Sequence, residues 1–200
     1  MDILQKSKNN QRRIGLTGGI ASGKTTITNY IRKHKNIPIL DADHFSRELI
    51  KPNTYGYKKI LDYFGNKIID NKSNSKREIN RKLLRNIIFQ HSASKEWIEK
   101  LLHPLIKERM IEECSQYRNN QTIVLVIPLL FEAKFEDICT EIWLVKCPKE
   151  LQKNRLITRD KISKKEAYEL INFQFSFEEK RKFSDIILDN SDDQNKWIST

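Results

Sequence analysis

Long apolar runs, paired cysteines and low-complexity stretches are missing from this chain of 200 residues. No apolar run approaches the roughly 20 residues that a helix needs to cross a membrane, so no membrane association is expected. The three cysteines, Cys114, Cys139 and Cys147, form no C-x-x-C pair and are expected to be reduced thiols of a cytoplasmic protein. Residues 1–12 lack the apolar segment of a secretory signal and predict a flexible tail.

The chain also lacks a basic motif interleaved with aromatic residues, although its formal net charge is +11. Such a charge excess is typical of nucleic-acid-binding proteins. The missing RNA-binding motif favours a solvated basic surface instead, so no nucleic-acid partner is expected. A nucleic-acid-binding ATPase stays open as an alternative from a different functional class.

The most informative stretch is RIGLTGGIASGKTT, residues 13–26. Gly18, Gly23, Lys24 and Thr25 fit the motif G-x-x-x-x-G-K-[ST], between an apolar strand pattern and a helical pattern. Glycines let backbone N–H groups approach phosphate oxygens, and a helix start adds partial positive charge. Lys24 can reach the β- and γ-phosphates, and Thr25 can hold Mg²⁺. The stretch predicts a nucleotide-phosphate site rather than a simple glycine turn.

A second GTPase-like motif, D-x-x-G at Asp62–Gly65, follows a helical pattern rather than a strand. No N-K-x-D motif, which would read the base, occurs anywhere in the chain. We therefore interpret this match as chance.

Five short apolar segments, separated by helical patterns, predict an α/β fold with a five-stranded parallel sheet. The strands are expected around Ile14 and Leu16 and at 37–40, 122–127, 141–147 and 185–188. Helices are expected at 25–35, after Pro148, and from a capping box at Ser163–Glu166.

The long stretch between the second and third strands is helical in pattern and predicts a separate helical subdomain. A capping box at Ser75–Glu78 predicts a helix start there. Pro104 interrupts a later apolar stripe and is expected to kink or break that helix.

Polar residues follow the predicted strands, and the carboxyl ends of parallel strands face the ligand crevice. Asp43 follows the second strand and could accept a proton from a hydroxyl or help to hold Mg²⁺. The alternative is that Asp43 caps the next helix, and Asp41 is expected to be structural. Arg155 and Arg159 share a face of the helix after Pro148, where arginine could neutralise phosphoryl charge.

Six stretches together resemble the dephospho-CoA kinase family. They follow the family's order and spacing over nearly the whole chain from Arg13: RIGLTGGIASGKTT, LDADHFSREL, HPL, VIPLLFE, CPKELQKNRLITRD and SDIILDNS.

The resemblance implies a three-layer P-loop kinase of the nucleoside-monophosphate-kinase type over 13–200. Its core would comprise 13–50, 118–148 and 183–200, with a helical acceptor-binding subdomain at 51–117 and a lid at 149–182. The implied reaction is transfer of the ATP γ-phosphate to the ribose 3′-hydroxyl of dephospho-CoA, the last step of coenzyme A synthesis, with Mg²⁺ as cofactor. A monomer is expected, with an oligomer left open, and a kinase for a nucleoside monophosphate is the nearest rival.

Carried over by position, the resemblance implies that Asp43 is the general base, Arg155 the transition-state arginine and Lys24 the clamp on the transferred group. Mg²⁺ would be held by Thr25 and Asp43, in part through water. Acceptor-binding residues are expected at His103, Leu129 and Gln174. The expected ATP-binding residues are Gly18, Gly19, Ala21, Ser22, Gly23, Lys24, Thr25, Thr26, Arg159 and Asn190.

The chain departs from the family pattern at three places. Val126 stands where the family often has an acid, which shifts metal binding to Thr25 and Asp43. Leu170 replaces an arginine of the lid helix, and Phe175-Ser176 replaces Met-Pro, while Gln174 remains.

Overall fold

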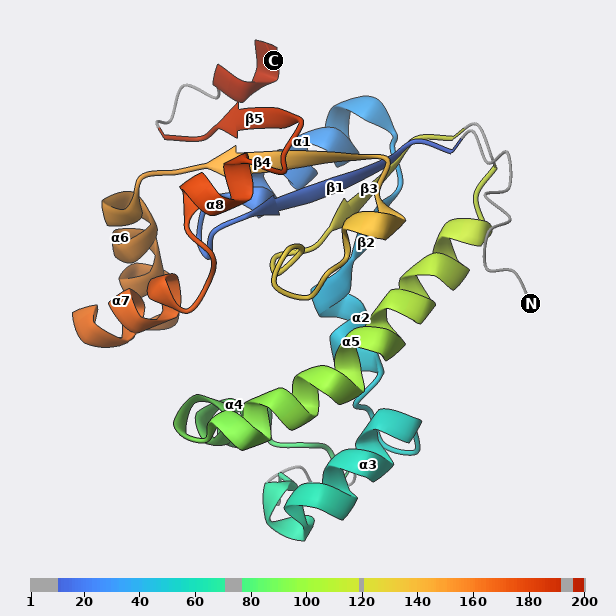
Figure 1. Cartoon of the computed structure of the whole chain (residues 1–200), viewed down its shortest axis with the longest axis vertical. Coiled ribbons are helices and arrows are strands. Elements are labelled where there is room, and N and C mark those ends of the chain that lie inside the picture. Colours follow the sequence, from blue (N-terminus) through green and yellow to red (C-terminus); the bar gives the residue numbers. More distant parts are fainter. Residues whose placement is uncertain (1–10, 71–76, 119–120, 192–195, 200) are drawn as a thin grey trace. The chain divides into compact units, whose positions relative to one another are not determined.

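The computed structural model describes residues 11–70, 77–118, 121–191 and 196–199 (Figure 1). The chain divides into two compact units. The first, the sheet unit, comprises Met1–Asp41 and Glu113–Thr200; the second, the helical unit, comprises Ala42–Glu112. The acceptor-binding subdomain predicted from the sequence, 51–117, overlaps most of this helical unit.

The sheet unit contains one sheet of five parallel strands in the order β2-β3-β1-β4-β5. The predicted five-stranded parallel α/β sheet is confirmed. β1 and β2 are parallel, as predicted, but β3 lies between them. The bounds are β1 Arg13–Gly18, β2 Ile39–Asp41, β3 Ile123–Val126, β4 Glu141–Lys146 and β5 Ile186–Asp189.

β1 is buried on both faces because it is the central strand. Ile14 and Leu16 pack against Ile27 and Ile31 of α1 (Lys24–Lys35) in one core cluster. On the opposite face the chain has Gly15, where an added Cβ would lie 2.6 Å from Cys139 Sγ. The missing side chain therefore lets the segment after β3 pack directly on the strand.

Among its described residues, the sheet unit also contains three helices and two short 3₁₀ turns: α6 (Lys149–Asp160), α7 (Lys164–Asn172), α8 (Phe177–Arg181), η2 (Glu136–Ile138) and η3 (Lys196–Ser199). The predicted capping box of Ser163 and Glu166 is confirmed at the start of α7. A second capping box, which the sequence reading missed, joins Ser176 to Glu179 and starts α8. Ser176 therefore begins this short helix with a side-chain cap.

The first ten residues of the predicted tail lie outside the described residues. Gln11, near the end of that tail, is 2% exposed. Its side chain donates hydrogen bonds to Cys114 O at 3.0 Å and Arg118 O at 3.4 Å. Gln11 is therefore packed rather than part of a flexible tail, and its amide satisfies carbonyls at the end of a long helix.

The helical unit has its own core, built from α2 (Ala42–Glu48), α3 (Tyr55–Phe64), η1 (Asn66–Ile68), α4 (Arg81–Gln90) and α5 (Ser92–Ser115), of which the last turn belongs to the sheet unit. The buried members of this core are Tyr57, Ile60, Phe64, Ile68, Ile79, Leu84 and Ile98. None of the helices within the described ranges is both long and apolar enough to cross a membrane.

The structure differs from the sequence-based expectation at two places in the helical unit. The helix expected at the Ser75–Glu78 box begins instead at Arg81, capped by Asn80, whose side chain accepts from Leu83 N. Part of that box, 75–76, lies outside the described residues. Of the kink or break predicted at Pro104, the break does not occur, since α5 continues through this residue. Pro104 and Lys100 are both exposed, so water can satisfy the carbonyl that proline leaves without a donor.

Replacing Gly56 with alanine should destabilise the helical unit, although alanine normally stabilises a helix by about 1 kcal/mol relative to glycine. The reason is that an added Cβ would lie 2.4 Å from the Leu49 carbonyl oxygen. We expect Gly56→Ala to lower the free energy of unfolding by about 1–3 kcal/mol in urea denaturation. Lys58→Ala, at an exposed position of the same helix, should change it by less than about 0.5 kcal/mol. Equal stability of the two variants would contradict the predicted clash.

Candidate active site

The phosphate-loop motif lies where the sequence predicts it, between the central strand and the first helix. β1 ends at Gly18 and α1 begins at Lys24. Ala21 and Gly23 have φ values of 57° and 98°, in the left-handed region, which turns the backbone sharply before the helix. Gly23 is the N-cap of α1 and has no side chain to cap it. The first helical N–H groups and the helix dipole therefore suit an anionic ligand.

Lys24 folds back over the loop. Its Nζ donates to the carbonyl oxygen of Gly18 at 2.8 Å and to that of Gly19 at 3.0 Å. These two contacts hold the ammonium group beside the turn. This arrangement places a cation where the motif predicts phosphate binding.

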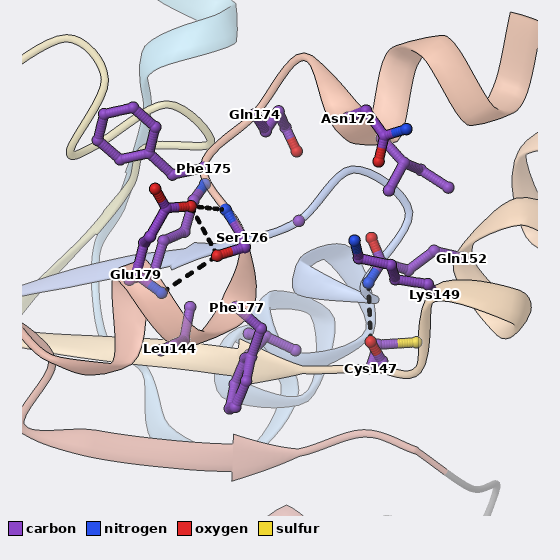
Figure 2. A pocket seen from close by; sticks show the side chains of 14 residues that line it. Leu144, Cys147, Lys149, Gln152, Asn172, Gln174, Phe175, Ser176, Phe177 and Glu179 are labelled. Atoms are coloured by element: carbon purple, nitrogen blue, oxygen red, sulfur yellow. Dashed lines mark hydrogen bonds between the residues drawn. The ribbon is translucent and has the colours of Figure 1, made fainter.

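Three neutral carboxamide side chains contact the loop from different elements of the sheet unit. Asn190, which directly follows β5, is 4% exposed and donates to Ser22 O at 2.8 Å. Gln174, between α7 and α8, accepts from Ile20 N at 2.7 Å. Gln152 of α6 donates to Cys147 O at 2.7 Å and lies directly against Gly19 (Figure 2).

Two of these carboxamides lie so close to loop glycines that an added side chain would have to displace them. An added Cβ at Gly23 would lie 1.9 Å from Asn190 Nδ2, and one at Gly19 would lie 2.5 Å from Gln152 Oε1. Gly23 also has a φ that L side chains rarely adopt. The expected ATP-binding residue Asn190 is therefore buried against the loop, where it supports the backbone that would hold phosphate.

The two arginines of α6 differ in their surroundings. Arg155 points at the loop: its Nη1 lies 3.5 Å from Ser22 O and 3.4 Å from Cys147 Sγ. Arg159 is exposed and donates to the carboxylate of Asp160 at 2.7 and 3.0 Å, and this hydrogen bonding raises the pKa of Arg159. The structure thus brings Arg155, but not the Arg159 guanidinium, to the phosphate loop.

Burial raises the pKa of the Cys147 thiol, although the nearby Arg155 charge acts in the opposite direction. Cys147 follows β4, and its carbonyl is already occupied by Gln152. The thiol is therefore protonated near neutral pH and offers neither a nucleophile nor a metal ligand.

The edge of the sheet beside the loop contains one of the expected acceptor-binding residues. Thr17 Oγ1 donates to Pro128 O at 3.3 Å, which ties the turn after β3 to the end of β1. Leu129 lies in this turn and is half-buried. Val126, where an acid was expected, pairs in register with Asp41 at the end of β2. A carboxylate is therefore present in the same row of the sheet, one strand away.

Asp43 and His103 belong to the helical unit, and their positions relative to the phosphate loop stay predictions. Asp43 is exposed and is the second residue of α2, so it is not the residue that precedes the helix as an N-cap would be. His103 lies inside α5. Burial lowers its pKa, against the opposing charge of Glu99, so the imidazole is neutral at pH 7.

A cavity of about 220 Å³ opens beside the loop in the sheet unit. Gly19 and Gln174 line it together with Lys149, Asn172 and Phe175 (Figure 2). Lys180, which also lines this cavity, forms an ion pair that the sequence did not predict: its Nζ lies 2.9 Å from Glu132 Oε1. No local pattern could reveal this pair, since its members lie far apart in the sequence.

The comparisons with known proteins agree with this geometry. A family model described as dephospho-CoA kinase matches residues 12–196. A dephospho-CoA kinase of Prochlorococcus marinus (strain MIT 9312) is 86% identical over 200 residues, covering 100% of this chain and 98% of the relative. A dephospho-CoA kinase of Synechocystis sp. (strain ATCC 27184 / PCC 6803 / Kazusa) is 39% identical over 181 residues, 90% of this chain and 88% of the relative.

Two solved structures share the fold. The protein TT1252 from Thermus thermophilus superposes with a TM-score of 0.78 at 26% identity, over 94% of this chain and 93% of that one. A dephospho-CoA kinase from Campylobacter jejuni superposes with a TM-score of 0.67 at 26% identity, over 94% and 92%. With the phosphate loop, the parallel sheet and the matched family model in agreement, this chain belongs to the dephospho-CoA kinase family.

Proposed function

We propose that this chain transfers the γ-phosphoryl group of ATP to the ribose 3′-hydroxyl of dephospho-CoA, which yields coenzyme A and ADP in the final step of coenzyme A synthesis. The observation that carries this proposal is the phosphate loop at the end of the central strand, with Lys24 across it, in a chain of this family. A cytoplasmic location and a monomeric state stay predictions.

In the proposed reaction, the loop and two cations neutralise the charge of the transferred group. Backbone N–H groups at the start of α1 would hold the phosphates of ATP. Lys24 would exchange its contacts with Gly18 O and Gly19 O for phosphate oxygens, since a charged acceptor is a stronger partner than a carbonyl. Arg155 extends toward the loop from α6 and would stabilise the charge that spreads over the equatorial oxygens in the transition state.

Asp43 is the proposed general base. The acceptor hydroxyl oxygen forms a bond to the γ-phosphorus while the bond from that phosphorus to the bridging oxygen breaks, and ADP leaves. The hydroxyl proton passes to the Asp43 carboxylate. The side chain is exposed on the first turn of α2, which suits a group that must reach a bound substrate.

The residues present fit a Mg²⁺ ion that arrives with the nucleotide. Within the described ranges, no group of three or more His, Cys, Asp or Glu side chains could hold a metal by itself. Mg²⁺ commonly uses one or two protein oxygens together with phosphate oxygens and water. Thr25, exposed in the first turn of α1, and Asp43 would hold the ion, partly through water. When bound, the ion would neutralise phosphate charge.

The helical unit offers a cavity of suitable charge for the acceptor. Its volume is about 230 Å³, and it is lined by His44, Arg47, Glu48, Ile50, Lys51, Glu78, Ile79 and Arg81. The basic side chains there outnumber the acidic ones, which suits the diphosphate of dephospho-CoA. His103, neutral at pH 7 because burial lowers its pKa, could donate or accept a hydrogen bond with the same substrate.

The proposed substrate can be tested by measuring ADP release with ATP, Mg²⁺ and one candidate acceptor at a time. Dephospho-CoA should raise ADP release far above background, and mass spectrometry should find a product with one added phosphoryl group. The comparison arms are a panel of nucleoside monophosphates and a nucleic acid. Background hydrolysis with dephospho-CoA would overturn the proposal, and stimulation by one of the other arms would identify the rival function instead.

Asp43→Asn should lower kcat by about 100-fold or more, because the amide cannot accept the proton. The dissociation constant for ATP, measured by calorimetry, should stay close to that of the wild type. Asp62→Asn is the matched control, since Asp62 is an exposed carboxylate on α3 of the same unit, and its kcat should be unchanged. Turnover of Asp43→Asn within a few-fold of the wild type would exclude this residue as the base.

Arg155→Ala should reduce kcat by roughly 100-fold or more, because a transition-state contact is lost, while ATP affinity changes much less. Lys153→Ala, on the same helix and paired with Glu150 in the native chain, serves as the charge-matched control. Steady-state kinetics and ATP calorimetry separate the two effects. If only the affinity for ATP falls, Arg155 is a binding residue and not a catalytic one.

A further inference from the structure

The segment that returns from α7 to the sheet is bonded to the phosphate loop through one side chain. Gln174 extends from the four residues between α7 and α8, and its Oε1 accepts from Ile20 N at 2.7 Å. The two residues lie 154 positions apart in the sequence. Ile20 is the third residue of the motif that begins at Gly18, so the bond acts within the turn itself.

We propose that Gln174 is a positioning residue for phosphoryl transfer, which holds the phosphate loop in its working shape through the Ile20 N–H group. The inference rests on the proposed kinase function and assigns Gln174 a role different from the acceptor binding expected from its sequence position. Within a carboxamide only the oxygen can accept from an N–H donor, so the Gln174 oxygen is committed to the loop.

The segment carrying Gln174 is fixed by a buried anchor next to it. Phe175 N donates to Glu132 Oε1 at 2.9 Å, and the same oxygen lies 2.9 Å from Lys180 Nζ. The Lys180 side chain is 1% exposed and that of Glu132 is 16% exposed. A buried charge pair of this kind holds its elements firmly, because separating the partners would leave a charge without compensation.

The capping box of α8 adds a second constraint on the segment that carries Gln174. Ser176 Oγ accepts from Glu179 N, and Ser176 N donates to Glu179 Oε2 at 2.7 Å (Figure 2). Gln174 is therefore followed at once by one residue bonded to Glu132 and by another that begins a capped helix. A side chain held by such a backbone can define the position of its hydrogen-bond partner closely.

A neutral acceptor suits this position beside an anion-binding loop. A carboxylate could accept the same N–H bond, but its negative charge would oppose the phosphates of the nucleotide. An apolar side chain of equal length would leave Ile20 N–H without its partner, and a part-buried donor left in that state favours rearrangement of the turn. Glutamine alone among these choices supplies the bond without the charge.

Three variants separate these contributions. Gln174→Met keeps the length and removes the acceptor. Gln174→Glu keeps an acceptor oxygen and adds a charge. Gln116→Met makes the same chemical change at an exposed glutamine after α5, and serves as the matched control. Each is assayed for kcat, for KM of ATP and of dephospho-CoA, for its thermal midpoint, and for hydrogen exchange of the Ile20 amide.

For Gln174→Met we expect a kcat roughly tenfold lower, since the loop is misplaced in the transition state, with the KM for dephospho-CoA within about twofold of the wild type. The Ile20 amide should exchange at least about tenfold faster, while Leu16 of β1 keeps its protection. Gln174→Glu should retain slow Ile20 exchange and more of the kcat, and its KM for ATP should rise. Gln116→Met should match the wild type throughout.

Three results would overturn the proposal. A rise in the KM for dephospho-CoA alone would return Gln174 to acceptor binding. A lower thermal midpoint with unchanged kcat would make its role purely structural. Unchanged Ile20 exchange in Gln174→Met would remove the bond on which the inference stands. The exchange measurement needs no substrate, so it tests Gln174 even if the wild type fails to phosphorylate dephospho-CoA, a result that would count against the proposed function separately.

Discussion

The structure depends on a turn of backbone that must present N–H groups at the start of α1 to an anion while side chains from other elements hold its shape. Residues 19–23 meet this demand with two left-handed positions, Ala21 and Gly23. Behind them lie three carboxamides, and amides can satisfy backbone donors and acceptors without adding charge. The positive field of Lys24, Arg155 and the helix start is therefore not weakened by the side chains that shape the loop.

The order of the strands explains why those supporting side chains can converge. β1 is central, with β3 on one side and β4 on the other. The residues that follow β3, β4 and β5 all lie at the edge where β1 enters the loop, since parallel strands end at the same edge. On one side, Thr17 at the end of β1 donates to Pro128, which follows β3. On the other side, Asn190, which follows β5, donates to Ser22 of the loop.

The sequence was sufficient for the features that depend on short-range patterns. The loop motif, the five strands and the Ser163 cap could all be predicted, because each depends on residues within a few positions of one another. The start of α4 could not, since two capping patterns compete near it. The choice depends on Ile79, which is buried in the helical core and forms an antiparallel bridge with Ile69, and this draws the chain into extended form until Asn80.

The candidate site likewise contains some features that the sequence could predict and others that it could not. Lys24 and Arg155 could be placed from the loop motif and from helical spacing. The bond from Gln174 to Ile20 and the pair of Glu132 with Lys180 could not, because they join segments that only the folded chain brings together. The continuation of α5 through Pro104 depends on exposure, which a stripe of apolar residues does not reveal.

The scarcity of cysteine has a chemical consequence for an enzyme whose proposed substrate and product both carry a thiol. Burial raises the pKa of all three cysteines, that of Cys139 to about 12. Thiol–disulfide exchange proceeds through the thiolate, so protonated thiols react slowly with the disulfide forms of such molecules. Cys147 lies beside Arg155, which points at the phosphate loop, and because burial raises the pKa of its thiol we expect it to form mixed disulfides slowly there.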